Sequence, residues 1–223
     1  MLNLPNDGLS AADFARPEGP VGRQLANLMY ESNESMIFHA ADVLAIQPDD
    51  QLLEIGQASG QHLFELMQRY EGVTYTGVEH AHTMHHLCLN NEALTQFNCQ
   101  FIKVAAYSYL LPFTDNQFEK ILTVNVIYFY SRIMAALQEY RRVLKPGGCV
   151  AIAFKDIRTL VTAPLDFTGM IMYEPYTIRE LLVETGFVDI EVSSYYEHSP
   201  RADGHHNECC YHVVKAYNSD RSN

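Results

Sequence analysis

The stretch from Leu52 to Gln61 constrains the fold of this chain more than any other. An apolar run ends at Glu54-Ile55-Gly56, a turn of small residues follows, and a helix begins near Gln61. Glycines at 56 and 60 let the backbone approach a ligand closely, and the start of the following helix offers unpaired N–H groups. A strand that runs through such a turn into a helix is typical of a doubly wound sheet that binds a nucleoside-bearing cofactor.

The rest of the chain alternates between short Val/Ile/Leu-rich runs and segments with helical periodicity. We expect strands at 51–56, 73–79, 100–105, 119–125 and 148–154, and helices at 22–31, 34–45, 61–70, 82–96, 131–144 and 176–185. Such alternation predicts an α/β fold: a Rossmann-like, doubly wound, mostly parallel seven-stranded sheet with helices on both faces. Two β-rich runs without a helix between them, 187–196 and 209–216, predict a C-terminal antiparallel hairpin.

Composition excludes several classes of function. The formal charge is −12, from 27 acidic residues against 15 lysines and arginines, so a nucleic acid would be repelled. No apolar run is long enough to span a bilayer, and no basic region precedes an apolar one at the N-terminus. Five irregularly spaced cysteines indicate reduced thiols. We therefore expect a cytoplasmic protein that acts on a small molecule; its oligomeric state stays open.

The spacing of the turn argues against a dinucleotide. The fingerprint Gly-x-Gly-x-x-Gly, started at Gly56, places Ala58 and Gln61 where the second and third glycines belong. The glycine that permits close helix–sheet packing is therefore missing. Glu79, at the end of the second strand, is positioned to accept hydrogen bonds from both hydroxyls of a ribose. An NAD-dependent oxidoreductase is thus the weaker alternative.

Four separated motifs, in this order, give the chain a family resemblance. It resembles the class I S-adenosylmethionine-dependent methyltransferases, in particular the ubiquinone/menaquinone-biosynthesis-like (methyltransferase type 11) group, over roughly residues 16–216. The motifs are Leu53-Glu54-Ile55-Gly56 with Gly60, Gly77-Val78-Glu79, Leu111-Pro112-Phe113 with Phe118-Glu119-Lys120-Ile121, and Arg142-Val143-Leu144-Lys145-Pro146-Gly147-Gly148.

The resemblance implies S-adenosylmethionine as cofactor and a set of binding residues. The turn would line the methionine end and the sugar, Glu79 would hold the ribose, His80 would flank the adenine, and Asn125 would face the sulfonium. The implied cofactor residues are Glu54, Gly56, Gln57, Ala58, Gly60, Glu79, His80, Tyr107, Ser108 and Asn125. Two positions depart from the family: Ala58 replaces a glycine, which is tolerated if its φ is negative, and Tyr107 stands where relatives often carry an aspartate.

The resemblance also implies a division of the chain. Residues 1–45 would form an N-terminal arm and lid helices, with Met29 and Asn33 as lid residues. Residues 46–217 would form the methyltransferase domain, and 218–223 a flexible tail. A lid excludes water and completes the acceptor pocket.

Methyl transfer from a sulfonium is an in-line displacement, so the protein mainly supplies proximity, orientation and a dry site. A base is needed only for a protonated acceptor. Candidates follow the carboxyl ends of the strands, with Tyr128 and His198 as catalytic choices and Tyr173, Arg201 and His205 as substrate contacts; Tyr130, Lys155, Asp156 and His206 occupy similar positions. We expect a small polar acceptor, with the acceptor atom open.

Histidines and cysteines invite other interpretations. His82 and His86 have i,i+4 spacing, but no carboxylate or cysteine completes a ligand set at motif spacing, so we expect no metal. Cys209 and Cys210 are consecutive in a predicted strand and should face opposite sides of the sheet. The competing hypothesis for the whole chain is a non-catalytic cofactor- or partner-binding domain that kept the methyltransferase fold.

Overall fold

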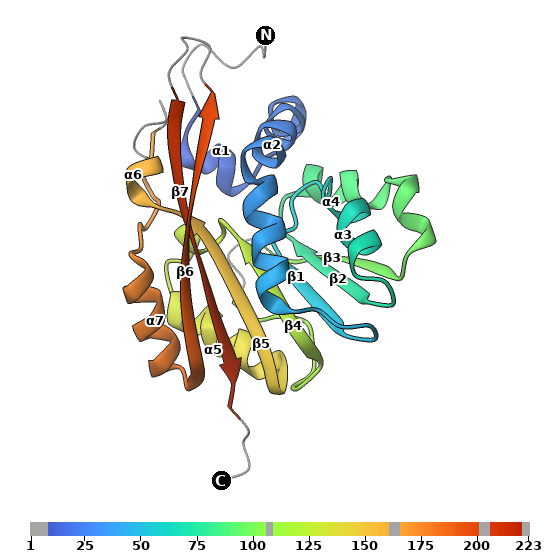
Figure 1. Ribbon diagram of the computed structural model, residues 1–223. Helices are drawn as coiled ribbons and strands as arrows, with labels where there is room; N and C mark the ends of the chain where they lie inside the picture. The colour runs from blue at the N-terminus through green and yellow to red at the C-terminus, as the bar shows by residue number, and fades with distance from the viewer. Residues whose placement is uncertain (1–8, 106–108, 161–165, 201–205, 220–223) are drawn as a thin grey trace.

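The protein is an α/β molecule built on one seven-stranded sheet (Figure 1). The computed structural model describes residues 9–105, 109–160, 166–200 and 206–219, with side chains except at 198–200 and 206–208. The strand order is β3-β2-β1-β4-β5-β7-β6. The strands are β1 (Gln51–Ile55), β2 (Thr74–Glu79), β3 (Cys99–Lys103), β4 (Phe118–Val124), β5 (Leu144–Lys155), β6 (Phe187–Pro200) and β7 (His206–Asn218).

The sheet is parallel from β3 to β5 and antiparallel from β5 through β7 to β6. The first three strands extend in one direction from β1, and β4 then pairs with the other side of β1. This reversal is a topological switch point, where loops diverge from the carboxyl ends of the strands and leave room for a ligand. The predicted sheet with its antiparallel hairpin is confirmed.

Helices cover both faces of the sheet (Figure 1). One face carries α2 and α3, and the opposite face carries α5 and α7. The described α-helices are α1 (Ala11–Ala15), α2 (Gly19–Leu44), α3 (Leu63–Arg69), α4 (His82–Leu89), α5 (Ile133–Val143), α6 (Ile157–Leu160) and α7 (Pro175–Glu184); short 3-10 turns are η1 (Glu92–Gln96) and η2 (Ile127–Phe129). No helix in the described ranges has both the length and the apolar character needed to cross a membrane.

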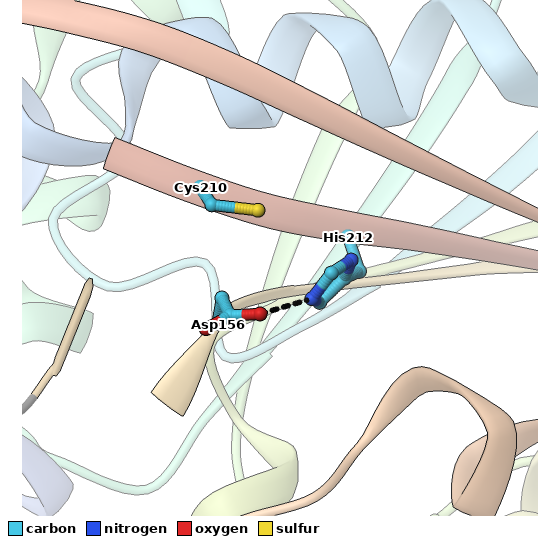
Figure 2. Close-up of side chains that lie close together, drawn as sticks. All are labelled: Asp156, Cys210 and His212. Atoms are coloured by element: carbon cyan, nitrogen blue, oxygen red, sulfur yellow. Dashed lines mark hydrogen bonds and ion pairs between the residues drawn. The ribbon is translucent and has the colours of Figure 1, made fainter. Parts of the chain in front are cut away.

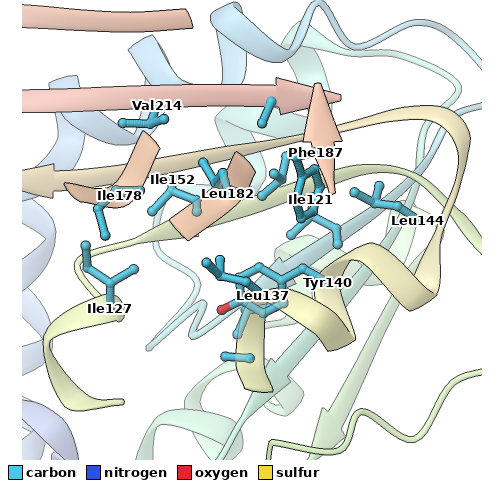
Figure 3. Close-up of a cluster of buried hydrophobic side chains, with 14 of the residues drawn as sticks. Ile121, Ile127, Leu137, Tyr140, Leu144, Ile152, Ile178, Leu182, Phe187 and Val214 are labelled. Atoms are coloured by element: carbon cyan, nitrogen blue, oxygen red, sulfur yellow. The ribbon is translucent and has the colours of Figure 1, made fainter. Parts of the chain in front are cut away.

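Strand β5 shows how the sequence builds a core on each face. Val150, Ile152 and Phe154 pack with α5 and α7, whereas Ala151 and Ala153 pack with α2 and α3. Side chains alternate across a strand, so a run that is apolar at every position buries both faces. Figure 3 shows the α5/α7 side, where Leu137, Tyr140, Ile178, Leu182 and Val214 meet around Ile152. Each buried side chain of this size contributes about 1.5–3 kcal/mol.

Several predicted boundaries differ from the structure, and three of the differences affect how the domain is built. Helices 22–31 and 34–45 are one continuous helix, α2, whose C-terminal half belongs to the core through Met36, Ala40 and Leu44. The expected flexible tail starts too early, because Asn218 ends β7, is buried, and donates from Nδ2 to the carbonyl oxygen of Leu144 at 2.8 Å. The hairpin strands extend beyond the predicted runs 187–196 and 209–216, because β6 continues to Pro200 and β7 begins at His206.

Candidate active site

A cavity of about 860 Å³ opens at the carboxyl ends of the central strands. Its walls come from the turn after β1, the end of β2, the loop after β4 and the N-terminal half of α2. Among the residues predicted from the sequence, it is lined by Glu54, Gly56, Gln57, Ala58, Gly60, Glu79, His80, Asn125, Tyr128, Met29 and Asn33. The volume lies within the range of cofactor pockets.

The turn after β1 is held in a conformation that few side chains accept. Gly56, Ala58 and Gly60 have φ values of +77°, +50° and +67°. The expectation that Ala58 is accommodated by a negative φ is therefore wrong, because its Cβ sits in the left-handed region, which costs an L-residue roughly 1–2 kcal/mol. Local bonds hold it there: its N–H donates to Glu79 Oε2 at 3.1 Å, and its carbonyl accepts from Cys88 Sγ at 3.4 Å.

At the two glycines of the turn, neighbouring side chains also leave no room for a Cβ atom. A Cβ on Gly56 would lie 2.6 Å from Val126 Cγ2, and one on Gly60 would lie 2.7 Å from Cys88 Sγ. Both distances are shorter than real Cβ contacts, so any side chain would force a neighbour to move. The turn thus brings bare backbone against the loop after β4 and against α4.

Glu79 is the acidic group at the end of β2. Its Oε1 accepts from the N–H groups of His80 and Ala81, both at 2.7 Å, and its Oε2 accepts from Ala58. Burial raises the pKa of Glu79, and the N–H bonds together with His80 oppose that rise. The carboxylate therefore links the end of β2 to the turn after β1 at the cavity wall.

Glu54 and Gln57 form the deeper part of the turn. Glu54 Oε2 is bonded to His62 Nε2 at 2.9 Å and accepts from Tyr75 Oη at 2.6 Å, and all three side chains are buried. Gln57 is also buried, and its Oε1 has no hydrogen-bond partner among the described residues. A buried amide oxygen without a partner costs about 1–3 kcal/mol. Because this oxygen has almost no accessible surface, a ligand would reach it only after the side chain moved.

Asn125, Tyr128 and Lys155 form one network where β4 and β5 end. Tyr128 Oη accepts a hydrogen bond from the N–H of Lys155 at 2.6 Å. The same hydroxyl can donate its hydrogen either to Asn125 Oδ1, at 2.9 Å, or to the carbonyl oxygen of Lys155, at 3.1 Å. Burial raises the pKa of Tyr128 far above 10. Tyr128 lines the cavity as predicted. Because its hydroxyl is already hydrogen-bonded to the backbone of Lys155, the structure favours a positioning role for Tyr128 over the role of a base. Asn125 Nδ2 donates to Asn33 Oδ1 at 3.0 Å, which joins α2 to the sheet edge.

The outer wall of the cavity combines the N-terminal segment with the segment after α6. Ser10 and Asp166 form an isolated parallel bridge, with the N–H of Ala11 donating to the Asp166 carbonyl at 2.7 Å. The side chains that this wall presents to the cavity are mostly apolar: Leu9, Phe14, Leu160, Phe167 and Met170.

Glu18 fastens this wall to the sheet edge. Its carboxylate accepts from the N–H groups of His82 and Thr83 at 2.9 and 3.0 Å and from Thr83 Oγ1 at 2.9 Å. Glu18 precedes α2, and the two N–H groups open α4, so a carboxylate from one helix caps another. Burial acts to raise the pKa of Glu18, but these bonds prevail and lower it to about 2.

Several predicted residues do not reach the described cavity. Tyr173 is absent from the described walls and packs, partly buried, against the α5/α7 core, and its assignment as a substrate contact stays a prediction. His198 belongs to β6, paired with Glu208, and does not lie in a loop. Tyr107, Ser108, Arg201 and His205 lie outside the described residues, and their roles stay predictions.

The cavity is also lined by residues outside the predicted site set, among them three ionisable side chains from β5, β6 and β7. They are Lys155 at the end of β5, Glu197 on β6 and Cys209 on β7. Lys155 could be suspected from its place after a parallel strand. The residues around Glu197 and Cys209 in the sequence do not indicate that these two line a site. They reach the cavity because β7 pairs with β5 and β6 pairs with β7.

Cys209 and Cys210 face opposite sides of β7, as expected. Cys209 lines the cavity, and Cys210 lies with Asp156 and His212 in a buried cluster whose candidate ligand atoms are all within 4.8 Å of one another (Figure 2). These three could supply ligands to a metal ion. Protein groups already hold the carboxylate, however: Asp156 Oδ2 bonds His212 Nε2 at 3.0 Å, and Arg158 Nε and Nη2 donate to its two oxygens at 2.8 and 2.9 Å. We assign this cluster to anchoring the end of β5.

Comparison with known proteins agrees with this arrangement. Residues 53–152 match a family model described as a methyltransferase domain. A fatty-acid O-methyltransferase of Mycolicibacterium smegmatis is 28% identical over 112 residues, which cover 50% of this chain and 39% of that protein. An uncharacterised protein of Methanocaldococcus jannaschii is 27% identical over 50% of this chain and 48% of its own length. The chain thus spans less than half the length of these two curated relatives.

Solved structures share the fold at low identity. One similar chain comes from the complex of the Haloferax volcanii Trm112 methyltransferase activator with a putative methyltransferase. It superimposes on this protein with a TM-score of 0.68 at 16% sequence identity, and the match covers 88% of this chain and 95% of that one. A Haemonchus contortus phosphoethanolamine N-methyltransferase 2, solved with phosphomonomethylethanolamine and S-adenosylhomocysteine, has a TM-score of 0.65 and 14% identity, covering 83% and 53%. The ubiquinone/menaquinone subgroup stays a prediction. The match over residues 53–152 and the shared fold agree with the resemblance to the class I S-adenosylmethionine-dependent methyltransferases.

Proposed function

We propose that this protein transfers a methyl group from S-adenosylmethionine to a small molecule. The observation that carries the proposal is the meeting of Glu54–Gly60, Glu79 and Asn125 on one cavity at the switch point of the sheet, within the matched methyltransferase domain. These are the residues to which the family resemblance assigns the cofactor.

The described residues fit that cofactor chemically. Glu79 presents a carboxylate at the end of β2, where ribose hydroxyls would donate. Gln57 lines the cavity within the turn, where the family resemblance places the methionine end and the sugar of the cofactor. The turn around Gly56 leaves backbone, rather than side chains, beside the cavity. Glu54, Gln57, Glu79, His80 and Asn125 would hold the cofactor.

When bound, S-adenosylmethionine supplies a methyl group that its sulfonium makes electrophilic. The chain's part is to orient the acceptor and to exclude water. Asn33 and Asn125 join α2 to the end of β4, and Glu18 fastens the N-terminal wall to α4. These contacts hold the apolar outer wall over the carboxyl ends of the strands.

The nature of the acceptor belongs to the proposal. The sequence predicts a small polar acceptor, whereas the outer wall supports a molecule with an apolar body, because Leu9, Phe14, Phe167 and Met170 line it. The M. smegmatis relative, named a fatty-acid O-methyltransferase, is consistent with such an acceptor.

Calorimetry with S-adenosylhomocysteine tests the cofactor site. We expect saturable binding to the intact protein and a loss of about tenfold or more in affinity for Glu79→Ala, because the removed carboxylate would accept charge-assisted hydrogen bonds. Glu180→Ala, at an exposed position of α7, is the matched control and should bind like wild type. Wild-type affinity in Glu79→Ala, or no binding by the intact protein, would contradict the proposal.

A non-catalytic domain would behave differently in a second assay. It would bind S-adenosylhomocysteine yet leave S-adenosylmethionine unconsumed in the presence of mixed small thiols, amines, phenols and carboxylic acids. Methylation of any of these molecules, detected by mass spectrometry, would exclude that alternative.

A further inference from the structure

Lys155 is a cationic side chain placed at the wall of the cavity. It ends β5 and lines the cavity together with Cys209 and Glu197. Burial lowers the pKa of Lys155, while Cys209 and Glu197 act to raise it. No carboxylate among the described residues comes within 4.0 Å of this ammonium.

Glu197 lines the same cavity but forms no ion pair within 4.0 Å with Lys155, and one of its two oxygens is bonded to another residue. Tyr211 Oη donates to Glu197 Oε1 at 2.9 Å, and Tyr211 is in turn bonded to His39 Nδ1 on α2. A partly buried ammonium without a close counterion carries a desolvation cost that an anionic ligand would offset. Lys155 is therefore suited to bind a negatively charged group that enters the cavity.

The backbone of Lys155 is held by the fold, which sets the direction in which its side chain leaves the strand. Its N–H donates to Tyr128 Oη, and the next residue, Asp156, is held by Arg158 and His212. Tyr128 also contacts Asn125, the residue expected to face the sulfonium. An anion bound by Lys155 would thus lie on the side of the cavity where the methyl group is to be delivered.

The rest of this region is apolar. Leu9, Phe14, Leu160, Phe167 and Met170 line the cavity from the N-terminal segment and from the segment after β5. An anion attached to an apolar body would match both features, with the body against these side chains and the charge at Lys155.

We propose that the acceptor is a carboxylic acid with an apolar body, and that the ammonium of Lys155 binds its carboxylate. This inference rests on the proposed methyl transfer and names the substrate class of the same site. One carboxylate oxygen forms the new O–CH₃ bond as the C–S bond of the sulfonium breaks, and the electron pair of that bond stays on sulfur. The products are a methyl ester and S-adenosylhomocysteine. No proton is released, so no base is needed, which agrees with the engaged hydroxyl of Tyr128.

Three probes of equal chain length test the charge requirement: decanoate, 1-decanol and decylamine. We expect decanoate to bind the protein saturated with S-adenosylhomocysteine about tenfold or more tightly than either neutral or cationic probe, measured by calorimetry. With S-adenosylmethionine instead, methyl decanoate should form and be detected by mass spectrometry.

Lys155→Gln tests the residue. It should weaken decanoate binding by about tenfold or more and leave 1-decanol and S-adenosylhomocysteine binding unchanged, which also shows that the variant is folded. Arg179→Gln makes the same change of charge at an exposed position on α7 and should behave like wild type.

Each other result counts against the proposal. Equal binding of decanoate and 1-decanol, or unchanged decanoate binding in Lys155→Gln, would overturn the acceptor class while leaving the cofactor site standing. Tightest binding of decylamine would assign the acceptor contact to Glu197. If S-adenosylhomocysteine does not bind, the proposed function and this inference fail together.

Discussion

At the scale of single residues, the site holds backbone and side chains in conformations that the fold imposes. Ala58 adopts a left-handed φ of +50° between two glycines that do the same. Bonds from Glu79 and Cys88 to its own backbone hold it in place. The unfavourable conformation is thus maintained by the groups that also shape the cavity, as is common at functional sites.

Ala58→Gly should stabilise the protein by up to about 1 kcal/mol, because glycine removes the left-handed penalty but loses more backbone entropy on folding. The measurement is the urea midpoint of unfolding. Ala135→Gly, inside helix α5, should instead destabilise by about 1 kcal/mol. Equal losses in the two variants would contradict the assigned conformation of Ala58.

Tyr128→Phe separates a positioning role from a chemical one. Removing the hydroxyl leaves the N–H of Lys155 with only its longer bond to Asn125 Oδ1 at 3.2 Å, so we expect a loss of about 0.5–1.5 kcal/mol in unfolding free energy. Tyr176→Phe, at an exposed site on α7, should change nothing. If Tyr128→Phe keeps wild-type stability but abolishes turnover, the tyrosine acts in the chemistry itself.

At the scale of elements, the contact between α2 and α4 decides how the outer wall is held. Glu18 caps the first turn of α4 from the start of α2, and Asn33 reaches Asn125 further along the same helix. Both contacts are polar and lie near the cavity, whereas the C-terminal half of α2 is buried against the sheet. The N-terminal half is therefore the part of α2 that can open while the rest stays packed.

The Glu18 contact should depend on pH. Its pKa is about 2 in the folded protein, below the ordinary 4.5, so its stabilising contribution is complete above pH 4.5 and is lost as the pH falls toward 2. Glu18→Gln should speed hydrogen exchange at the N–H groups of His82 and Thr83 at pH 7. The difference from wild type should shrink as the pH approaches 2.

The control for that experiment is Glu184→Gln, on the exposed face of α7. It should leave exchange at both amides unchanged at every pH. A difference between Glu18→Gln and wild type that stays constant down to pH 2 would contradict the role of the charge.

At the scale of the whole molecule, the cavity draws its walls from both ends of the chain. Leu9 lies near the N-terminus, Glu79 in the first half, and Glu197 and Cys209 in the C-terminal hairpin. Strand β7 makes this possible by pairing with β5 on one side and β6 on the other. A ligand that fills the cavity therefore stabilises distant parts of the sequence together.

S-adenosylhomocysteine at one hundred times its dissociation constant should raise the unfolding free energy by about 2.7 kcal/mol. For a chain of this length the expected rise in melting temperature is about 5–10 °C. Differential scanning calorimetry measures it, and Glu79→Ala should show a markedly smaller rise at the same concentration. An equal rise in melting temperature in Glu79→Ala would show that Glu79, at the end of β2, does not contribute to binding.

Local chemistry in the sequence is enough to predict the mostly parallel sheet, its C-terminal hairpin and the cofactor turn. Buried strands, glycines at 56 and 60 and an acidic end to β2 each reflect a constraint carried by a few neighbouring residues. Tertiary structure alone decided that Ala58 is left-handed, that Tyr128 is engaged by the backbone, and that Lys155, Glu197 and Cys209 share a cavity with Leu9 and Phe14. These features depend on strand pairing and packing between residues far apart in the chain, and the local sequence pattern does not reveal such contacts.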